Sequence, residues 1–117
     1  MSRSVGAAAE RQAAKFLTDQ GYKIIERNYT CRLGEIDLIA EEAQVLVFIE
    51  VRARRHSRYG YPEETITPEK KRRITLTARQ YLTSRNIEEK ECRFDVVTIL
   101  GEAPPLLQRD AFAEPTY

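Results

Sequence analysis

Two short apolar segments, residues 35–40 and 45–52, each carry carboxylates where burial should exclude them. Both segments have the β-branched, apolar character of strands in a buried sheet, and only four residues separate them, so they are expected to form a hairpin. Successive side chains of a strand point to opposite faces. A hairpin loop with an even number of residues therefore places Asp37, Glu50 and Arg52 on the same face of the sheet.

Two hairpin registers are open. A two-residue loop would set Asp37 opposite Glu50, with the two Cβ atoms roughly 5 Å apart. A four-residue loop would set Glu35 opposite Glu50 and leave Asp37 diagonal to it. Buried carboxylates this close repel each other unless a cation or a proton relieves them. Mg²⁺ or Mn²⁺ would do so with one or two carboxylates because such hard cations keep several waters. The hairpin therefore predicts a metal site at Asp37 and Glu50, and a salt bridge with Arg52 is the alternative.

Glu10 and Arg52 are further candidates for this site. A first helix is expected over residues 5–20, and its apolar stripe consists of Gly6, Ala13, Ala14 and Leu17. Glu10 lies in line with this stripe and needs a partner there, so it is a candidate third metal ligand; the alternative is a partly solvated residue favoured by the helix dipole. Arg52 could stabilise charge on a phosphate, or equally form a salt bridge with Glu35 or Glu50. It cannot act as a base, since arginine stays protonated.

The remaining patterns complete an α-β-β-β-α-β order, which is typical of an α/β fold with a mixed sheet flanked by helices. These elements are a strand at residues 22–29, a helix from Pro68 to about residue 85 after the N-cap Thr67, and a strand at 93–100. Ile24 and Ile25 are expected at the apolar centre of the first strand. Residues 1–100 are predicted to form a single domain, and residues 101–117 a loosely attached, proline-containing tail.

Positive charge is concentrated in the middle of the chain. Residues 51–90 contain eleven Lys or Arg and five acidic residues, whereas the whole chain has a net charge of only +1. This asymmetry favours nucleic acid, DNA foremost, as a partner, with basic side chains on phosphates and tyrosine on unpaired bases; a solvated charged helix face is the alternative. The candidate contacts are Arg54, Arg55, Arg58, Tyr59, Lys70, Lys71, Arg72 and Arg73. His56 is expected to be a surface residue.

Several other classes of protein are not indicated. No apolar run approaches the roughly 20 residues that a membrane helix needs, and no secretory signal opens the chain. Cys31 and Cys92 are expected to be reduced thiols, so a cytoplasmic location is predicted. No zinc motif, nucleophilic triad or phosphate-cradling glycine loop is present, and no organic cofactor is predicted.

With these residues assembled, the chain resembles the YraN family of small bacterial proteins. Three segments carry the resemblance, and they are residues 34–39 (GEIDLI), 47–54 (VFIEVRAR) and 93–97 (RFDVV). It extends over about residues 5–100. That family is similar in pattern to the restriction-endonuclease-like nucleases, including archaeal Holliday junction resolvases, which have an α-β-β-β-α-β core. Those enzymes use an Asp, then a Glu-x-Lys on the next strand, often with a Glu from the first helix.

The resemblance implies that Asp37 and Glu50 hold Mg²⁺, that Glu10 assists, and that Arg52 occupies the lysine position. The expected activity is a Mg²⁺-dependent, structure-selective endonuclease acting on branched or junction DNA. Because Arg52 stands where the nucleases have lysine, the alternative is a non-catalytic nucleic-acid-binding protein of the same fold. A third alternative is an interaction protein whose acidic hairpin and basic helix serve a protein partner. A homodimer would suit cleavage of both DNA strands.

Overall fold

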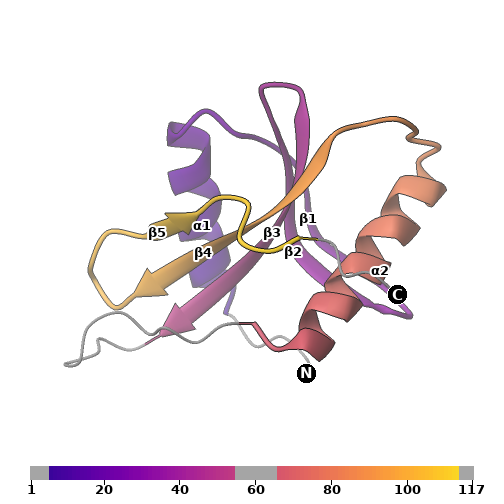
Figure 1. Ribbon diagram of the computed structural model, residues 1–117. Coiled ribbons are helices and arrows are strands. Elements are labelled where there is room, and N and C mark those ends of the chain that lie inside the picture. Colours follow the sequence, from indigo (N-terminus) through magenta and orange to yellow (C-terminus); the bar gives the residue numbers. More distant parts are fainter. Residues whose placement is uncertain (1–5, 55–65, 114–117) are drawn as a thin grey trace.

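The computed structural model describes residues 6–54 and 66–113 of the chain (Figure 1). Its elements are α1 (Ala7–Asp19), β1 (Lys23–Cys31), β2 (Gly34–Glu42), β3 (Val45–Arg54), α2 (Pro68–Ser84), β4 (Cys92–Leu100) and β5 (Leu106–Gln108). The predicted α-β-β-β-α-β order is confirmed, and one further strand follows it. None of the described helices is both long and apolar enough to cross a membrane.

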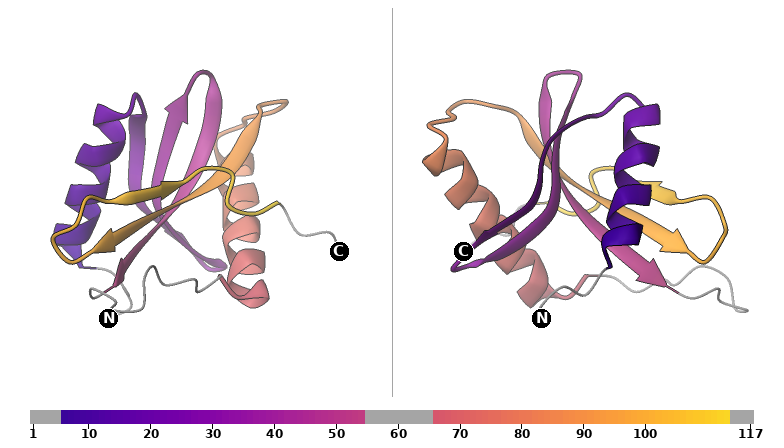
Figure 2. Two further views of the ribbon diagram at one scale, coloured as in Figure 1. Left: turned by 60° about the vertical axis from the view of Figure 1, so that its left-hand side comes forward. Right: turned by 180° about the vertical axis from the view of Figure 1, so that it is seen from behind.

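The strands form one mixed sheet with the order β1-β2-β3-β4-β5. β3 and β4 pair in parallel, and the other neighbouring strands pair antiparallel. A parallel pair needs a crossover connection, and α2 lies in the connection between β3 and β4. Helix α1 covers one face of the sheet and α2 the other, so the fold has three layers (Figure 2).

Each helix buries its apolar stripe against its own face of the sheet. On the α1 side, the core consists mainly of Ala13, Ala14, Leu17, Leu38, Val47, Ile49, Val51 and Val97. On the α2 side, it consists mainly of Ile39, Phe48, Ile74, Ala78, Tyr81, Phe94, Val96 and Phe112. Strand alternation puts Glu50, two residues after Phe48, on the α2 side. Asp37 lies between Ile36 and Leu38, which pack on opposite faces, so the alternation of β2 is interrupted at Asp37.

The β2–β3 hairpin adopts the first of the two predicted registers. Glu42 pairs with Val45, so the loop has two residues, Ala43 and Gln44, with φ angles of 50° and 71°. Positive φ angles at both loop residues are typical of a type I′ turn, whose backbone twist matches that of the two paired strands. The ladder continues to the pair Leu38–Ile49. Extending it by one pair brings Asp37 opposite Glu50.

The N-terminus of α2 is formed as predicted. The Thr67 hydroxyl accepts a hydrogen bond from the Lys70 N–H at 3.2 Å, and Pro68 occupies the first turn. The helix also lies close to the turn before β2, because a Cβ added to Gly34 would be 3.0 Å from Thr77 Oγ1. Gly34 has a φ of +155° as well. Glycine at this position thus lets α2 approach the strand that carries Asp37.

Two expectations for the edges of the sheet are wrong. Ile24 packs on the α1-side core, but Ile25 is 45% exposed because the β1–β2 register shifts between Ile24 and Glu26. A β-bulge of this kind turns one side chain away from its expected face. Residues 101–113 are also not a loose tail, since β5 pairs with β4 and Phe112 is buried. The fold therefore extends past the predicted boundary at residue 100.

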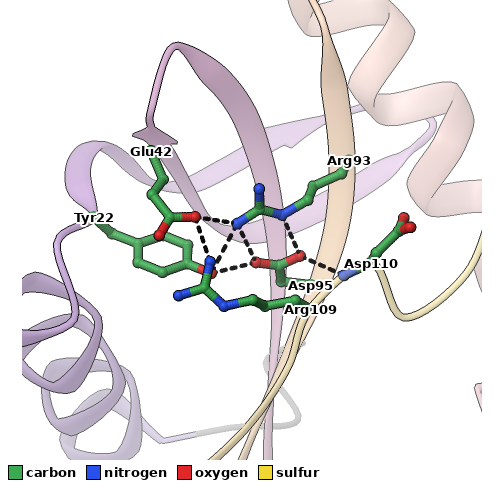
Figure 3. Close-up of polar contacts among 6 residues, drawn as sticks. All are labelled: Tyr22, Glu42, Arg93, Asp95, Arg109 and Asp110. Carbon is green, nitrogen blue, oxygen red and sulfur yellow. Dashed lines mark hydrogen bonds and ion pairs between the residues drawn. The ribbon is translucent and has the colours of Figure 1, made fainter.

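A network of charged side chains fixes this C-terminal segment (Figure 3). Asp95 of β4 is fully buried and accepts hydrogen bonds from Tyr22 Oη at 2.6 Å, Arg93 Nε at 3.0 Å and the backbone N–H of Asp110 at 2.8 Å. Arg93 and Arg109 both donate to Glu42 Oε1 at 2.5 Å. The network joins β4, the hairpin and the C-terminal segment, so Asp95 has a structural role.

Candidate active site

The site is centred on two buried carboxylates of neighbouring strands. Asp37 of β2 is 6% exposed and Glu50 of β3 is 8% exposed. The backbone N–H of Val51 donates to Asp37 Oδ2 at 2.8 Å, where the β2–β3 ladder has ended. This bond fixes the orientation of the Asp37 carboxylate. The predicted convergence of the two acids at the ends of paired strands is thus present in the fold.

The two carboxylates interact electrostatically. Burial raises the pKa of Glu50 above its ordinary value, and the negative charge of Asp37 raises it further. Lys70 opposes both effects, because a hydrogen bond from its ammonium lowers the pKa of Glu50. A cation near the pair therefore favours the ionised form of Glu50.

Lys70 reaches this pair from helix α2. Its Nζ lies 2.6 Å from Glu50 Oε2, and its side chain is 46% exposed. The charge pattern of the sequence predicts Lys70 as a contact to the nucleic-acid backbone and does not indicate this ion pair with Glu50. Helical spacing could have found it, since Lys70 lies four residues before the buried Ile74 and eight before the buried Ala78. Lys70 thus begins the stripe that faces the sheet.

Arg52 lies two residues beyond Glu50 and is partly buried. Its charge also lowers the pKa of Glu50, but Lys70 has the larger effect. The face predicted for Arg52 agrees with this interaction. Lysine and arginine thus both act on the pair, one from the helix and one from the strand.

Glu10 lies on the buried stripe of helix α1. It is 5% exposed and shares the buried stripe of α1 with Ala13, Ala14 and Leu17, as predicted; Gly6 is exposed instead. Within residues 6–54 and 66–113, no three His, Cys, Asp or Glu side chains are grouped closely enough to hold one metal ion. This arrangement therefore does not bring Glu10 to Asp37 and Glu50 as a third ligand, and that role stays a prediction.

The donor set of the pair fits a hard divalent cation. Asp37 and Glu50 offer carboxylate oxygens from two adjacent strands, and such cations bind through one or two carboxylates while keeping water ligands. Burial and the charge of Asp37 raise the pKa of Glu50, so added positive charge would favour its ionised form. A cation would supply that charge.

The predicted nucleic-acid contacts on α2 lie in different environments. Lys71 Nζ is 5.6 Å from the ring centroid of Phe112, Arg73 forms an ion pair with Glu69 at 3.4 Å, and Arg72 is exposed. At the end of β3, Arg54 donates to the carbonyl of Ala53 at 2.9 Å. The other candidates of this loop, Arg55, His56, Arg58 and Tyr59, lie outside the described residues.

A cavity of about 590 Å³ opens beside Lys70. It lies between the turn that joins β1 to β2 and the first turns of α2. The lining residues that carry polar groups near the pair are Thr30, Glu35, Thr67, Glu69, Lys70 and Arg73. The volume falls within the range of small-molecule pockets. Lys70 lines this cavity and also contacts Glu50, so it links the cavity to the acidic pair.

The fold and the site define a small three-layer α/β protein with a carboxylate-bearing hairpin. The chain belongs to the Uncharacterised protein family UPF0102, whose model matches residues 9–99. The three segments that carry the YraN resemblance fall within this match, and the expected membership is confirmed at the level of UPF0102.

Curated relatives agree with this membership. A UPF0102 protein of Lachnoclostridium phytofermentans is 51% identical over 104 residues, which are 88% of each chain. A UPF0102 protein of Symbiobacterium thermophilum is 54% identical over 99 residues, which are 85% of this chain and 84% of the relative. A third, from Alkalilimnicola ehrlichii, is 46% identical over 111 residues, 94% of this chain and 87% of the relative. The similarity thus spans nearly whole proteins.

Among solved structures, the chain is similar to a repair endonuclease from Pyrococcus abyssi, with a TM-score of 0.42 and 18% sequence identity. The match covers 87% of this chain and 42% of that chain. The present chain therefore corresponds to less than half the length of that protein.

Proposed function

We propose that this protein is a divalent-metal-dependent endonuclease that hydrolyses phosphodiester bonds in DNA, with branched or junction DNA as its preferred substrate. The observation that carries the proposal is the burial of Asp37 and Glu50 on neighbouring strands, immediately beyond the last β2–β3 pair. Two buried acids this close together raise the free energy of the folded state unless a cation binds them and offsets their charge. The sequence pattern around them, an Asp followed by a Glu on the next strand, supports the same activity.

The residues of this chain would contribute to hydrolysis by holding a metal ion and by orienting the DNA phosphate. Asp37 and Glu50 would hold Mg²⁺ or Mn²⁺, and the Val51 N–H fixes the Asp37 carboxylate for that purpose. A bound cation of this type polarises a phosphodiester and lowers the pKa of a water. Arg52 would place positive charge near the phosphate as negative charge develops on it. Arg54 and the basic residues that begin α2 would hold the backbone on either side.

A nucleic-acid-binding protein without hydrolysis is the second candidate. It is favoured by one observation, the arginine at position 52, where the nuclease pattern has lysine. Arginine supplies charge and hydrogen bonds but cannot accept a proton from water. Under this candidate the acidic pair and the basic helix would bind nucleic acid and leave it intact.

Incubation of the purified protein with branched, flapped and linear DNA in Mg²⁺ or Mn²⁺ separates the two candidates. We expect cleavage that EDTA abolishes and that falls roughly 100-fold or more in Asp37→Asn and in Glu50→Gln, because each variant removes a charged ligand. Glu41→Gln is the matched control on the same strand, since Glu41 pairs with Lys90 at 2.8 Å. If the wild-type protein binds these DNAs and cuts none of them, the endonuclease proposal fails and the binding protein remains.

A further inference from the structure

Lys70 connects the buried acidic pair to the cavity beside it. Its ammonium is 2.6 Å from Glu50 Oε2, yet 46% of its side chain remains exposed. The same residue lines the cavity between α2 and the turn before β2. A polyanion that entered this cavity would meet the Lys70 ammonium at the edge of the pair.

The position of Lys70 is fixed by the fold. Its backbone N–H is bound to the capping hydroxyl of Thr67, so the residue lies in the first turn of a capped helix. Ile74, one turn later, is buried against the sheet. Gly34 allows the helix to approach β2 closely. Little conformational freedom remains for the backbone of Lys70, which is the condition for a preorganised contact.

The chemistry of a lysine suits two simultaneous contacts. An ammonium has three donors, so Lys70 can keep its hydrogen bond to Glu50 and donate another to a phosphate oxygen. The cavity also carries Glu35 and an ion pair between Glu69 and Arg73. The cavity surface therefore has mixed charge, and Lys70 is the lining residue that contacts Glu50 of the acidic pair.

We infer that Lys70 is the residue of this chain that contacts the scissile phosphate at the Asp37–Glu50 pair, supplying from helix α2 the lysine that β3 lacks at position 52. This inference rests on the proposed function and extends it to a named catalytic residue. The phosphate would accept a second hydrogen bond from the Lys70 ammonium on the cavity side of Glu50, while the Lys70–Glu50 contact is kept.

The test compares Lys70→Met, which removes the charge, with Lys70→Arg, which keeps it. Lys15→Met is the matched control, because Lys15 forms a surface ion pair with Asp19 on α1, across the sheet. DNA binding in EDTA is measured by fluorescence anisotropy at several salt concentrations. We expect Lys70→Met to reduce the slope of log Kd against log salt by about 0.9, the value for one lost phosphate contact, and Lys70→Arg and Lys15→Met to keep the wild-type slope.

Single-turnover cleavage at saturating protein supplies the second measurement. We expect the Lys70→Met rate to fall by about 100-fold, as when one preorganised donor is lost, with the fold verified by circular dichroism. A wild-type slope overturns the inference, and so does a reduced slope with an unchanged rate, because the contacted phosphate would then lie away from the pair. If wild-type protein cuts no DNA, the proposed function fails, while the salt slope still decides whether Lys70 contacts phosphate.

Discussion

Asp37 and Glu50 are destabilising residues that this fold retains. Each carboxylate is almost completely removed from water, and the charge of Asp37 further raises the pKa of Glu50. Lys70 relieves part of this cost through its 2.6 Å contact with Glu50. Natural proteins commonly trade stability for function at such sites. Substitutions that remove a charge without removing a hydrogen bond should therefore stabilise the protein.

Asp37 provides that comparison. We expect Asp37→Asn to raise the free energy of unfolding at pH 7, because it removes the charge that raises the pKa of Glu50 while the amide oxygen can still accept the Val51 N–H bond. Asp37→Ala should instead lower it by about 1–3 kcal/mol, since that buried N–H loses its acceptor. Urea unfolding in EDTA measures both variants. If the Asn variant is as unstable as the Ala variant, repulsion between the two carboxylates is not the main term that lowers the free energy of unfolding.

At the scale of elements, helix α2 is the part that assembles the site. The hairpin brings the two acids together, but only α2 delivers Lys70 to them. Two local features set its position, namely the Thr67 cap at its start and the close approach at Gly34. Removing the Thr67 cap should therefore lower the stability of the helix end that carries Lys70.

Thr67→Ala tests the cap. We expect the free energy of unfolding to fall by about 1 kcal/mol, because the Lys70 N–H loses its side-chain acceptor. Thr83→Ala is the matched control, since Thr83 is an exposed residue of the same helix and alanine has the higher helix propensity. That control should be neutral or slightly stabilising in the same urea measurement. Equal losses in both variants would mean that the cap contributes nothing.

At the scale of the whole molecule, the network around Asp95 joins segments that are far apart in the sequence (Figure 3). Tyr22 follows α1, Glu42 ends β2, and Arg109 follows β5. These contacts lie on the α1 side of the sheet, whereas Phe112 stacks on Phe94 on the α2 side at 4.9 Å between centroids. The C-terminal segment is thus held on both faces.

The network predicts a dependence of stability on alkaline pH. Burial, and then the hydrogen bond to Asp95, raise the pKa of Tyr22 from 10.0 to about 12. The protonated phenol is therefore favoured in the folded state, so its contribution is complete below pH 10 and is lost between about pH 10 and 12. Tyr22→Phe should be less stable at pH 8 but should lose less stability over that alkaline range.

Urea midpoints at pH 8, 10 and 11 check this prediction. Tyr29→Phe is the control, because Tyr29 packs edge-on against Tyr81 on the other face of the sheet. It should follow the wild-type decline, because it leaves the Tyr22 phenol and its hydrogen bonds in place. Parallel declines in wild type and Tyr22→Phe would rule out the phenol as the source.

Patterns of short range predicted most of the elements. The period of two in residues 35–52 identified the hairpin, and the sequence Thr67-Pro68-Glu69 identified the start of α2. Ile25 was misplaced because a β-bulge depends on the partner strand. Residues 101–113 were misassigned because β5 and Phe112 are stabilised by contacts with β4, and a single-sequence pattern does not contain those contacts.

The sequence by itself therefore determined the element order and the position of Asp37 and Glu50 on adjacent, mostly apolar strands, because both follow from local periodicity. The tertiary structure determined that the Lys70 ammonium is a cation that contacts this pair. Lys70 is 20 residues from Glu50 along the chain, and its 2.6 Å contact exists only because α2 packs over that face of the sheet. The same packing places α1, the helix that carries Glu10, on the face of the sheet opposite α2 (Figure 2).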